Sequence, residues 1–203
     1  RDDLLETADD ALGKLANLVT DLLDVSRLQS GVLGVSVMPV DPAEVIMPAL
    51  DELSLGPADV EIDLGADVPE MVADPALLQR VVVNLLSNAL RYEPAGGRVR
   101  LATSSFADRV EIRVIDHGPG IPEDRRDDVM VPFQRLGDAD STVGLGLGLA
   151  LSKGFVEGMD GTLALEDTPG GGLTMVISLP RVGHAAAGHD DVDHDDIEEG
   201  SAR

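Results

Sequence analysis

The sequence predicts an α+β fold, a two-layer sandwich in which a mainly antiparallel sheet carries helices on one face and is preceded by one long helix. Short runs that alternate between apolar and polar residues, typical of strands with one buried face, recur between residues 34 and 179. Helical patterns lie among them, but without the regular strand and helix alternation of parallel βαβ units. A heptad pattern precedes all of these runs and predicts the long helix.

The heptad pattern covers residues 4–25, where apolar residues follow one another at steps of four and three. Glycines at positions 31 and 34 would end this helix. Its apolar stripe is too wide for a two-stranded coil and favours one helix of a four-helix bundle. The alternative is a helix packed on its own domain. We expect residues 1–30 to be a partial bundle segment, and the chain, which begins without Met, to belong to a longer protein.

Residues 31–181 are expected to form one domain. Alternation predicts strands over residues 34–40, 60–64, 98–106, 109–115, 162–166 and 173–179. Helical patterns occupy residues 43–53, 81–93, 123–130 and 146–158. Asp41-Pro42 and Asp74-Pro75 each combine an N-cap residue with a proline suited to the first helical position. Two helices are therefore expected to begin at these pairs.

The composition excludes several kinds of function. A formal net charge of −23 argues against a nonspecific surface for nucleic acid or anionic membrane, since phosphates would be repelled. The absence of cysteine excludes disulfides and thiolate metal sites. No apolar run approaches the roughly 20 residues that span a bilayer. Residues 182–203 have almost no apolar content, so we expect a disordered acidic tail in which His189 and His194 have no scaffold to bind metal.

The helical pattern over residues 81–93 carries polar residues on an otherwise apolar helix. Asn84, Asn88 and Arg91 lie at i, i+4 and i+7, and these spacings share one helix face. Amide oxygens suit a hard cation such as Mg²⁺ and a guanidinium suits phosphate, which together suggest a magnesium nucleotide. The alternative is that the amides hydrogen-bond to neighbouring loops, because a buried amide without a partner costs about 1–3 kcal/mol.

Two glycine-rich motifs follow. Asp116 begins Asp-His-Gly-Pro-Gly-Ile at the end of a predicted strand, where its carboxylate can accept a hydrogen bond from an exocyclic amine such as adenine N6. Residues 144–149, Gly-Leu-Gly-Leu-Gly-Leu, open a predicted helix, and backbone amides at such a helix start can hold phosphate. Taken alone, each motif is also typical of an ordinary turn or loop.

The order of these motifs resembles the ATP-binding domain of sensor histidine kinases, with the fold shared by histidine kinase, gyrase and chaperone ATPases. Residues 84–89, 116–120, 132–135 and 144–149 are similar to the N, G1, F and G2 boxes of that family. Residues 4–28 resemble the second helix of its dimerisation and phosphotransfer hairpin. The segments Gly-Thr at 161–162 and Thr-Pro-Gly-Gly-Gly-Leu-Thr at 168–174 are similar to potassium-responsive Kdp-type sensor kinases.

The resemblance implies ATP and Mg²⁺ as cofactors. Asn88 would bind the metal, Asn84 would support the phosphates and the magnesium shell, and Arg91 stands where the family usually has a phosphate-contacting Lys. Met130 stands where the F box usually has its first Phe, an apolar substitution of similar bulk that affects how a lid docks.

The resemblance also implies how the nucleotide is held. Tyr92 would lie against adenine, Asp116 would bind its N6 amine, and Arg135 would reach the γ-phosphate under a lid over roughly residues 137–145. The remaining residues implied in nucleotide binding are Gly118, Gly120, Gly144, Gly146, Leu147, Gly148 and Leu149.

The function implied is a protein-histidine kinase that transfers the γ-phosphate of ATP to a histidine on an upstream helix, for relay to an aspartate of a response regulator. Homodimerisation through the helical bundle is implied as well, as is a cytoplasmic kinase portion of a membrane-anchored sensor. The histidines of this chain are His117, His184, His189 and His194. None follows the family's acceptor pattern of His then acid on a helix, so we expect the acceptor to lie outside this chain.

Two other functions stay open at this point. One is an ATP-hydrolysing clamp of the gyrase or chaperone type. Those relatives place a carboxylate base where this chain has Asn84, and an amide cannot deprotonate water. The other is a noncatalytic nucleotide-sensing or dimerisation module. An upstream helix bearing His-Asp/Glu-x-x-x-Pro would favour the kinase over both.

Overall fold

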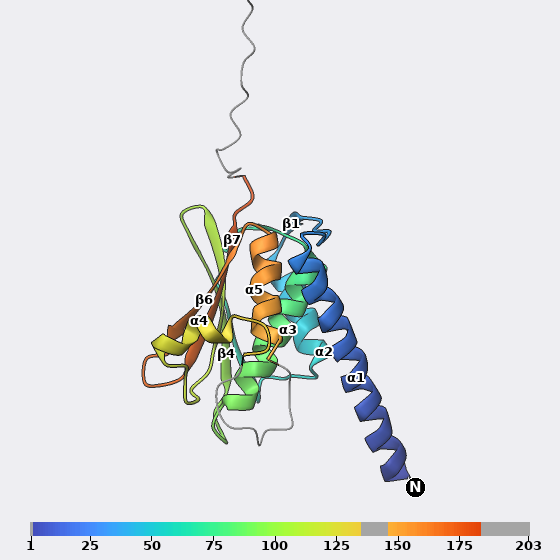
Figure 1. Ribbon diagram of the computed structural model, residues 1–203. Coiled ribbons are helices and arrows are strands. Elements are labelled where there is room, and N and C mark those ends of the chain that lie inside the picture. The colour runs from blue at the N-terminus through green and yellow to red at the C-terminus, as the bar shows by residue number, and fades with distance from the viewer. Residues whose placement is uncertain (1, 135–145, 184–203) are drawn as a thin grey trace, which may run out of the picture.

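The predicted α+β sandwich is confirmed by a computed structural model, which describes residues 2–134 and 146–183 (Figure 1). One layer is a five-stranded sheet and the other is a layer of helices on one of its faces. The helices of this layer are α2 (Pro42–Glu52), α3 (Pro75–Tyr92) and α5 (Gly148–Gly158). The long helix α1 (Asp2–Gln29) lies outside this layer, on the side away from the sheet.

The main sheet has the strand order β2-β4-β5-β7-β6. Its strands are β2 (Val60–Leu64), β4 (Val99–Phe106), β5 (Arg109–Ile115), β6 (Thr162–Asp167) and β7 (Leu173–Pro180). All neighbours are antiparallel except β2 and β4, and the connection between these two parallel strands contains α3, as a parallel crossover requires. The prediction of a mainly antiparallel sheet is therefore confirmed.

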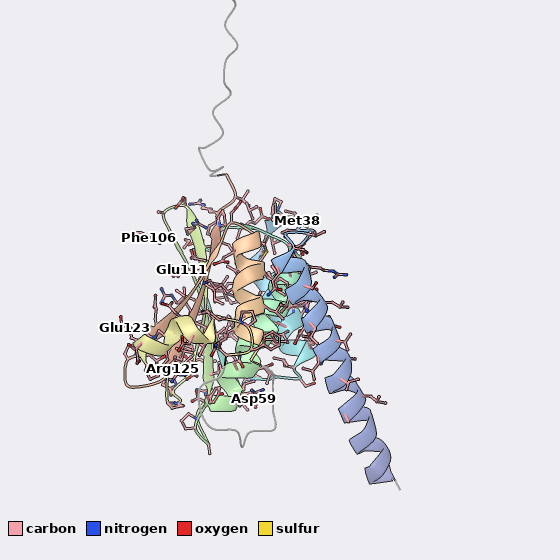
Figure 2. The ribbon with its side chains drawn as sticks, viewed as in Figure 1. Met38, Asp59, Phe106, Glu111, Glu123 and Arg125 are labelled. Carbon is pink, nitrogen blue, oxygen red and sulfur yellow. The ribbon has the colours of Figure 1, made fainter. Side chains whose placement is uncertain are left out.

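The core lies between the sheet and its helical layer. Along β5, Val110, Ile112 and Val114 are fully buried, while the residues between them face the other side of the sheet. There, Arg113 forms ion pairs with Glu111 at 2.8 Å and with a glutamate of β6 at 3.0 Å. Figure 2 labels Glu111 on this strand, and Phe106 near the end of the β4–β5 hairpin.

Both predicted aspartate caps are present. Asp41 caps α2 and Asp74 caps α3, each followed by a proline in the first helical turn. Asp74 Oδ1 accepts hydrogen bonds from the backbone N–H groups of Ala76 and Leu77, at 3.1 and 3.2 Å. Its Oδ2 accepts from the Ser36 N–H at 2.9 Å. One carboxylate thus fixes both the start of α3 and the chain that arrives from α1.

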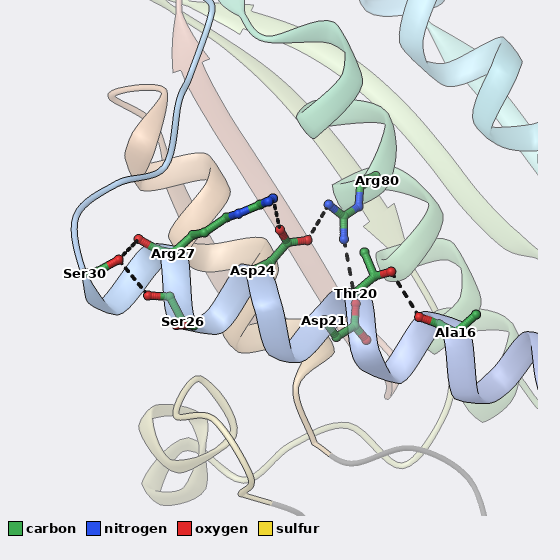
Figure 3. Close-up of polar contacts among 8 residues, drawn as sticks. All are labelled: Ala16, Thr20, Asp21, Asp24, Ser26, Arg27, Ser30 and Arg80. Atoms are coloured by element: carbon green, nitrogen blue, oxygen red, sulfur yellow. Dashed lines mark hydrogen bonds and ion pairs between the residues drawn. The ribbon is translucent and has the colours of Figure 1, made fainter.

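α1 is fastened to the helical layer by a polar contact in its C-terminal half (Figure 3). The Asp24 side chain is 5% exposed, and its Oδ2 lies 2.7 Å from Nη1 of Arg80 on α3. The Arg80 guanidinium also lies over the Phe155 ring of α5, 5.1 Å from its centroid. The long helix predicted from the heptad pattern over residues 4–25 is confirmed as α1.

Among residues 2–134 and 146–183, no helix has the length and apolar character to cross a bilayer.

The boundaries of the first strand differ from the prediction. The strand expected over residues 34–40 is only β1 (Met38–Val40), and it pairs with β3 (Met71–Ala73), which was not predicted. Three residues are too few to show the alternation that identifies a strand. This two-stranded sheet is separate from the main one.

The last predicted helix begins two residues late. α5 starts at Gly148 instead of Gly146, because Gly146 has a φ of +70°, which a right-handed helix does not accommodate. The helical pattern near residues 123–130 is confirmed as a 3₁₀ turn (Glu123–Arg125) followed by α4 (Arg126–Val129). Nearly all of the predicted acidic tail, residues 184–203, lies outside the described residues.

Candidate functional site

The polar side chains predicted on one helix face lie on the second half of α3. The helix runs without interruption from Pro75 to Tyr92, and its apolar face is locked into the core. Asn84 and Asn88 are half-buried, and Arg91 in the last turn is exposed. The rigid packing of the apolar face sets the direction of the polar one.

Asn84 contacts α5 through both ends of its amide. Its Nδ2 donates to the Ser152 hydroxyl at 2.8 Å. Its Oδ1 lies so near Gly148 that a Cβ at that position would come within 2.4 Å of it. A side chain at the first residue of α5 would therefore displace the Asn84 amide. The alternative, in which the amide hydrogen-bonds within the protein, therefore holds for Asn84, but its partner lies on a helix and not in a loop.

Asn88 lies one turn further along α3. None of the described residues hydrogen-bonds to its amide. No cluster of three or more His, Asp or Glu among the described residues is arranged to hold a metal ion. Mg²⁺ bound with nucleotide needs no such cluster, since it usually takes one or two protein oxygens and completes its shell with phosphate and water. An amide oxygen such as that of Asn88 fits this requirement.

Asp116 is 2% exposed at the end of β5. Its Oδ1 accepts two backbone hydrogen bonds, from Gly118 at 2.9 Å and from Leu173 at 3.1 Å. No described residue hydrogen-bonds to Oδ2, which leaves this oxygen as an acceptor. Burial raises the pKa of the Asp116 carboxyl, and the two backbone hydrogen bonds oppose that shift.

Glycines allow three segments to meet at Asp116. A Cβ on Gly118 would lie 2.5 Å from the Tyr92 carbonyl at the end of α3. A Cβ on Gly172, in the turn between β6 and β7, would lie 2.0 Å from the Asp116 carbonyl. Gly120 has a φ of +69° and packs on Gly172. The end of α3, the end of β5 and the β6–β7 turn therefore close around one carboxylate, with the Tyr92 side chain 54% exposed beside them.

The remaining predicted residues lie partly outside the described chain. Arg135, Gly144 and most of the predicted lid belong to residues 135–145, which are not described. Leu147 is buried and forms the N-cap position of α5, and Leu149 packs on the edge of the core. The helix that the glycine-rich motif opens thus begins beside Asn84.

Two polar residues of this region were missed from the sequence. Ser152 lies four residues after Gly148, which is the helical spacing that could have identified it as an α3 contact. Glu93 directly follows α3, and its side chain is only 6% exposed, with Oε2 accepting the His117 N–H at 2.9 Å. Its position at a helix end, before Pro94, carries no local signal of burial.

Comparisons with known proteins identify the family of this fold. Residues 73–183, more than half of the chain, match the family model described as histidine kinase-, DNA gyrase B-, and HSP90-like ATPase. The sensor protein KdpD of Rathayibacter rathayi is 66% identical over 166 residues, which cover 82% of this chain and 19% of that protein. The chain therefore spans about a fifth of the length of this relative.

Two solved structures show the same fold. The crystal structure of full-length ShkA in complex with AMPPNP is 27% identical, with a TM-score of 0.71 over 85% of this chain and 37% of that one. The mycobacterial sensor histidine kinase MprB is 32% identical, with a TM-score of 0.62 over 72% of this chain and 98% of that one. The chain belongs to the histidine kinase-, DNA gyrase B- and HSP90-like ATPase family, as the catalytic ATP-binding domain of a Kdp-type sensor histidine kinase.

Proposed function

We propose that this domain holds Mg·ATP for transfer of the γ-phosphate to a histidine outside the chain, in a protein-histidine kinase. The observation that carries the proposal is the buried Asp116, whose Oδ1 is held by two backbone N–H groups while Oδ2 has no described partner. Such an oxygen suits the exocyclic amine of adenine and would repel the carbonyl that guanine has at the same place.

The second half of α3 is proposed to hold the metal and the phosphates. Asn88 would coordinate Mg²⁺, which when bound would neutralise phosphate charge. Asn84, fixed by Ser152, would support the magnesium shell, and the exposed Arg91 would contact phosphate. The amide of Asn84 also disfavours an ATP-hydrolysing clamp, because it cannot act as a general base.

The rest of the nucleotide is proposed to lie between the end of α3 and the start of α5. Tyr92, 54% exposed beside Gly118, offers its ring to adenine. The backbone of residues 144–149 would surround the phosphates at the N-terminus of α5. Arg135 would reach the γ-phosphate.

The acceptor and the partners are proposed from the family and from α1. Several apolar side chains of α1 are 44–66% exposed, a stripe suited to a helical bundle. They are Leu12, Leu15, Val19, Leu22 and Leu23. We propose that α1 joins an upstream helix carrying the acceptor histidine in a homodimeric bundle. The phosphoryl group would then pass to an aspartate of a response regulator, in the cytoplasmic portion of a membrane-anchored sensor.

Calorimetry with Mg·ATP tests the binding step. The parent domain should bind, and Asn88→Ala should lose at least about tenfold in affinity while remaining folded, since one metal ligand is removed. Gln79→Ala is the matched control. It removes another carboxamide from α3, one that hydrogen-bonds to Glu52 instead of facing Asn84 and Asn88. If Asn88→Ala binds Mg·ATP with the affinity of the parent, Asn88 does not belong to the site. If the parent domain does not bind Mg·ATP, the proposed function is contradicted.

A labelling experiment tests the transfer step. With Mg·ATP, this chain alone should form no acid-labile phosphohistidine, and a second fragment that contains the upstream acceptor helix should become labelled when mixed with it. The same mixture with Asn88→Ala serves as the control. Acid-labile label on His117, His184, His189 or His194 of this chain alone would refute the upstream acceptor.

A further inference from the structure

A buried acid lies at the C-terminal end of α3. Glu93 ends the helix, and its backbone N–H donates to the Ala89 carbonyl. Its side chain is 6% exposed because the loop that follows folds over it, so closely that a Cβ on Gly97 would come within 2.0 Å of Glu93 Oε1. Burying a carboxylate costs free energy unless partners compensate. The partners of Glu93 therefore indicate what it does.

Both partners are groups of His117, the residue that follows Asp116. Glu93 Oε2 accepts the His117 backbone N–H at 2.9 Å, and Oε1 lies 3.4 Å from the ring Nδ1. The His117 ring itself is 52% exposed. One carboxylate thus holds both the backbone and the side chain of the turn that carries Asp116. The contact joins residues 24 positions apart in the sequence.

Glu93 and His117 also affect the pKa of the Asp116 carboxyl. Burial is the main cause that raises the pKa of Asp116, and the N–H groups of Gly118 and Leu173 lower it. The negative charge of Glu93, from the end of α3, raises the pKa further, and the adjacent His117 lowers it. The Leu173 N–H comes from the first residue of β7.

We infer that Glu93 and His117 are positioning residues of the base pocket: Glu93 holds the backbone and the ring of His117, and so fixes the turn that aims Asp116 at the base. The inference rests on the proposed function, in which Asp116 accepts the adenine amine. It adds two residues to the nucleotide site, one of which lies outside the family boxes matched in the sequence.

Affinities for Mg·ATP and Mg·GTP, measured by calorimetry from mildly acidic to mildly alkaline pH, test this inference. Glu93→Gln should weaken ATP binding about tenfold at neutral pH and narrow the preference for ATP over GTP, because a charged hydrogen-bond acceptor is lost. It should also shift the loss of ATP affinity in acid to lower pH, because a negative charge beside Asp116 is removed. His117→Asn should shift that loss to higher pH, because His117 lowers the pKa of Asp116 and the substitution removes this effect.

The matched control is Glu111→Gln, the same chemical change at a carboxylate that pairs with Arg113 on the outer face of β5. It should leave the ATP preference and the pH profile unchanged. Thermal unfolding verifies that each variant folds. Should Glu93→Gln not fold, His117→Asn, altered at an exposed ring, decides alone.

If Glu93 has only a structural role, Glu93→Gln should lower the affinities for ATP and for GTP by the same factor at every pH. That result, or a His117→Asn profile identical to that of the parent, would overturn the inference. A parent domain that fails to bind ATP would instead contradict the proposed function.

Discussion

The helices α1 and α3 both carry a repeating apolar stripe. Among the side chains that the structure describes, α3 buries most of its stripe and α1 leaves most of its stripe exposed. Along α3, Leu85 is fully buried, as are Leu78, Val81, Val82, Leu86 and Ala89. Along α1, Leu15 is 62% exposed and Leu22 is 44% exposed, whereas Val25 near its C-terminal end is buried. An apolar period therefore predicts a face that needs a partner, but does not predict where that partner lies.

The two helices also differ in how they are held. α3 is packed between α2, α5 and the sheet, and this packing leaves its polar face at a defined position. α1 is held near its C-terminal end by Val25 and by the ion pair between Asp24 and Arg80. A helix held by packing suits a binding site, and a helix held by a few contacts suits an element that joins a bundle. The following experiments test this difference, beginning with the largest expected effect.

Truncation of equivalent side chains should separate the two helices most clearly. Leu85→Ala on α3 should reduce the free energy of unfolding by about 2–5 kcal/mol, because it leaves a cavity in the core. Leu15→Ala on α1 should change it by less than about 0.5 kcal/mol, because the side chain is exposed in this chain. Denaturation with urea measures both. Equal losses would show that α1 is as much a part of the core as α3.

Removal of the charge on Asp24 should loosen α1 alone. The Asp24 carboxylate is nearly buried while Arg80 is 40% exposed, so solvent screens part of the attraction. Asp24→Asn should therefore lower the local stability of α1 by about 1–2 kcal/mol. Hydrogen exchange should become faster at the amides of α1 and stay unchanged in α3. Asp51→Asn, at an exposed position on α2, is the control. Equal acceleration in both helices would show that the ion pair stabilises the whole domain.

Most of the fold could be predicted from the sequence because its elements have local signals. The alternation of β5, the caps at Asp41 and Asp74 and the heptads of α1 each depend on residues within one or two turns of each other. β3 could not be predicted, since three residues show no period and the strand exists only through its pairing with β1. Local periodicity thus predicts elements well and pairings less well.

In the candidate site, too, some features could be predicted from the sequence and others could not. The shared face of Asn84 and Asn88 and the glycine-rich motifs follow from spacing along the chain. The hydrogen bond from Asn84 to Ser152 and the burial of Glu93 do not, because each depends on segments that only tertiary packing brings together. The tight approach of Gly172 to Asp116 is a contact of the same kind.

Removal of the charge on Asp116 should have the smallest effect on stability. This effect should be opposite in sign to that of removing the charge on Asp24. Burial raises the pKa of Asp116 in the folded state above its ordinary value of 3.8. The folded chain therefore binds this proton more tightly than the unfolded chain does. The stability gained in this way is fully present below pH 3.8 and is lost as the pH rises through the folded-state pKa, so at neutral pH the ionised carboxylate is a net cost.

Asp116→Asn removes this cost and keeps an oxygen that can accept the two backbone hydrogen bonds. Without nucleotide, the variant should be as stable as the parent or slightly more stable at pH 7, and its advantage should disappear as the solution is made acidic. Its preference for ATP over GTP should fall at the same time, because the amide no longer carries a negative charge toward the base. Thermal unfolding at neutral and acidic pH, together with calorimetry, measures both effects. A variant less stable than the parent at pH 7 would show that the Asp116 charge serves the fold, as we expect of Asp24, and not the site.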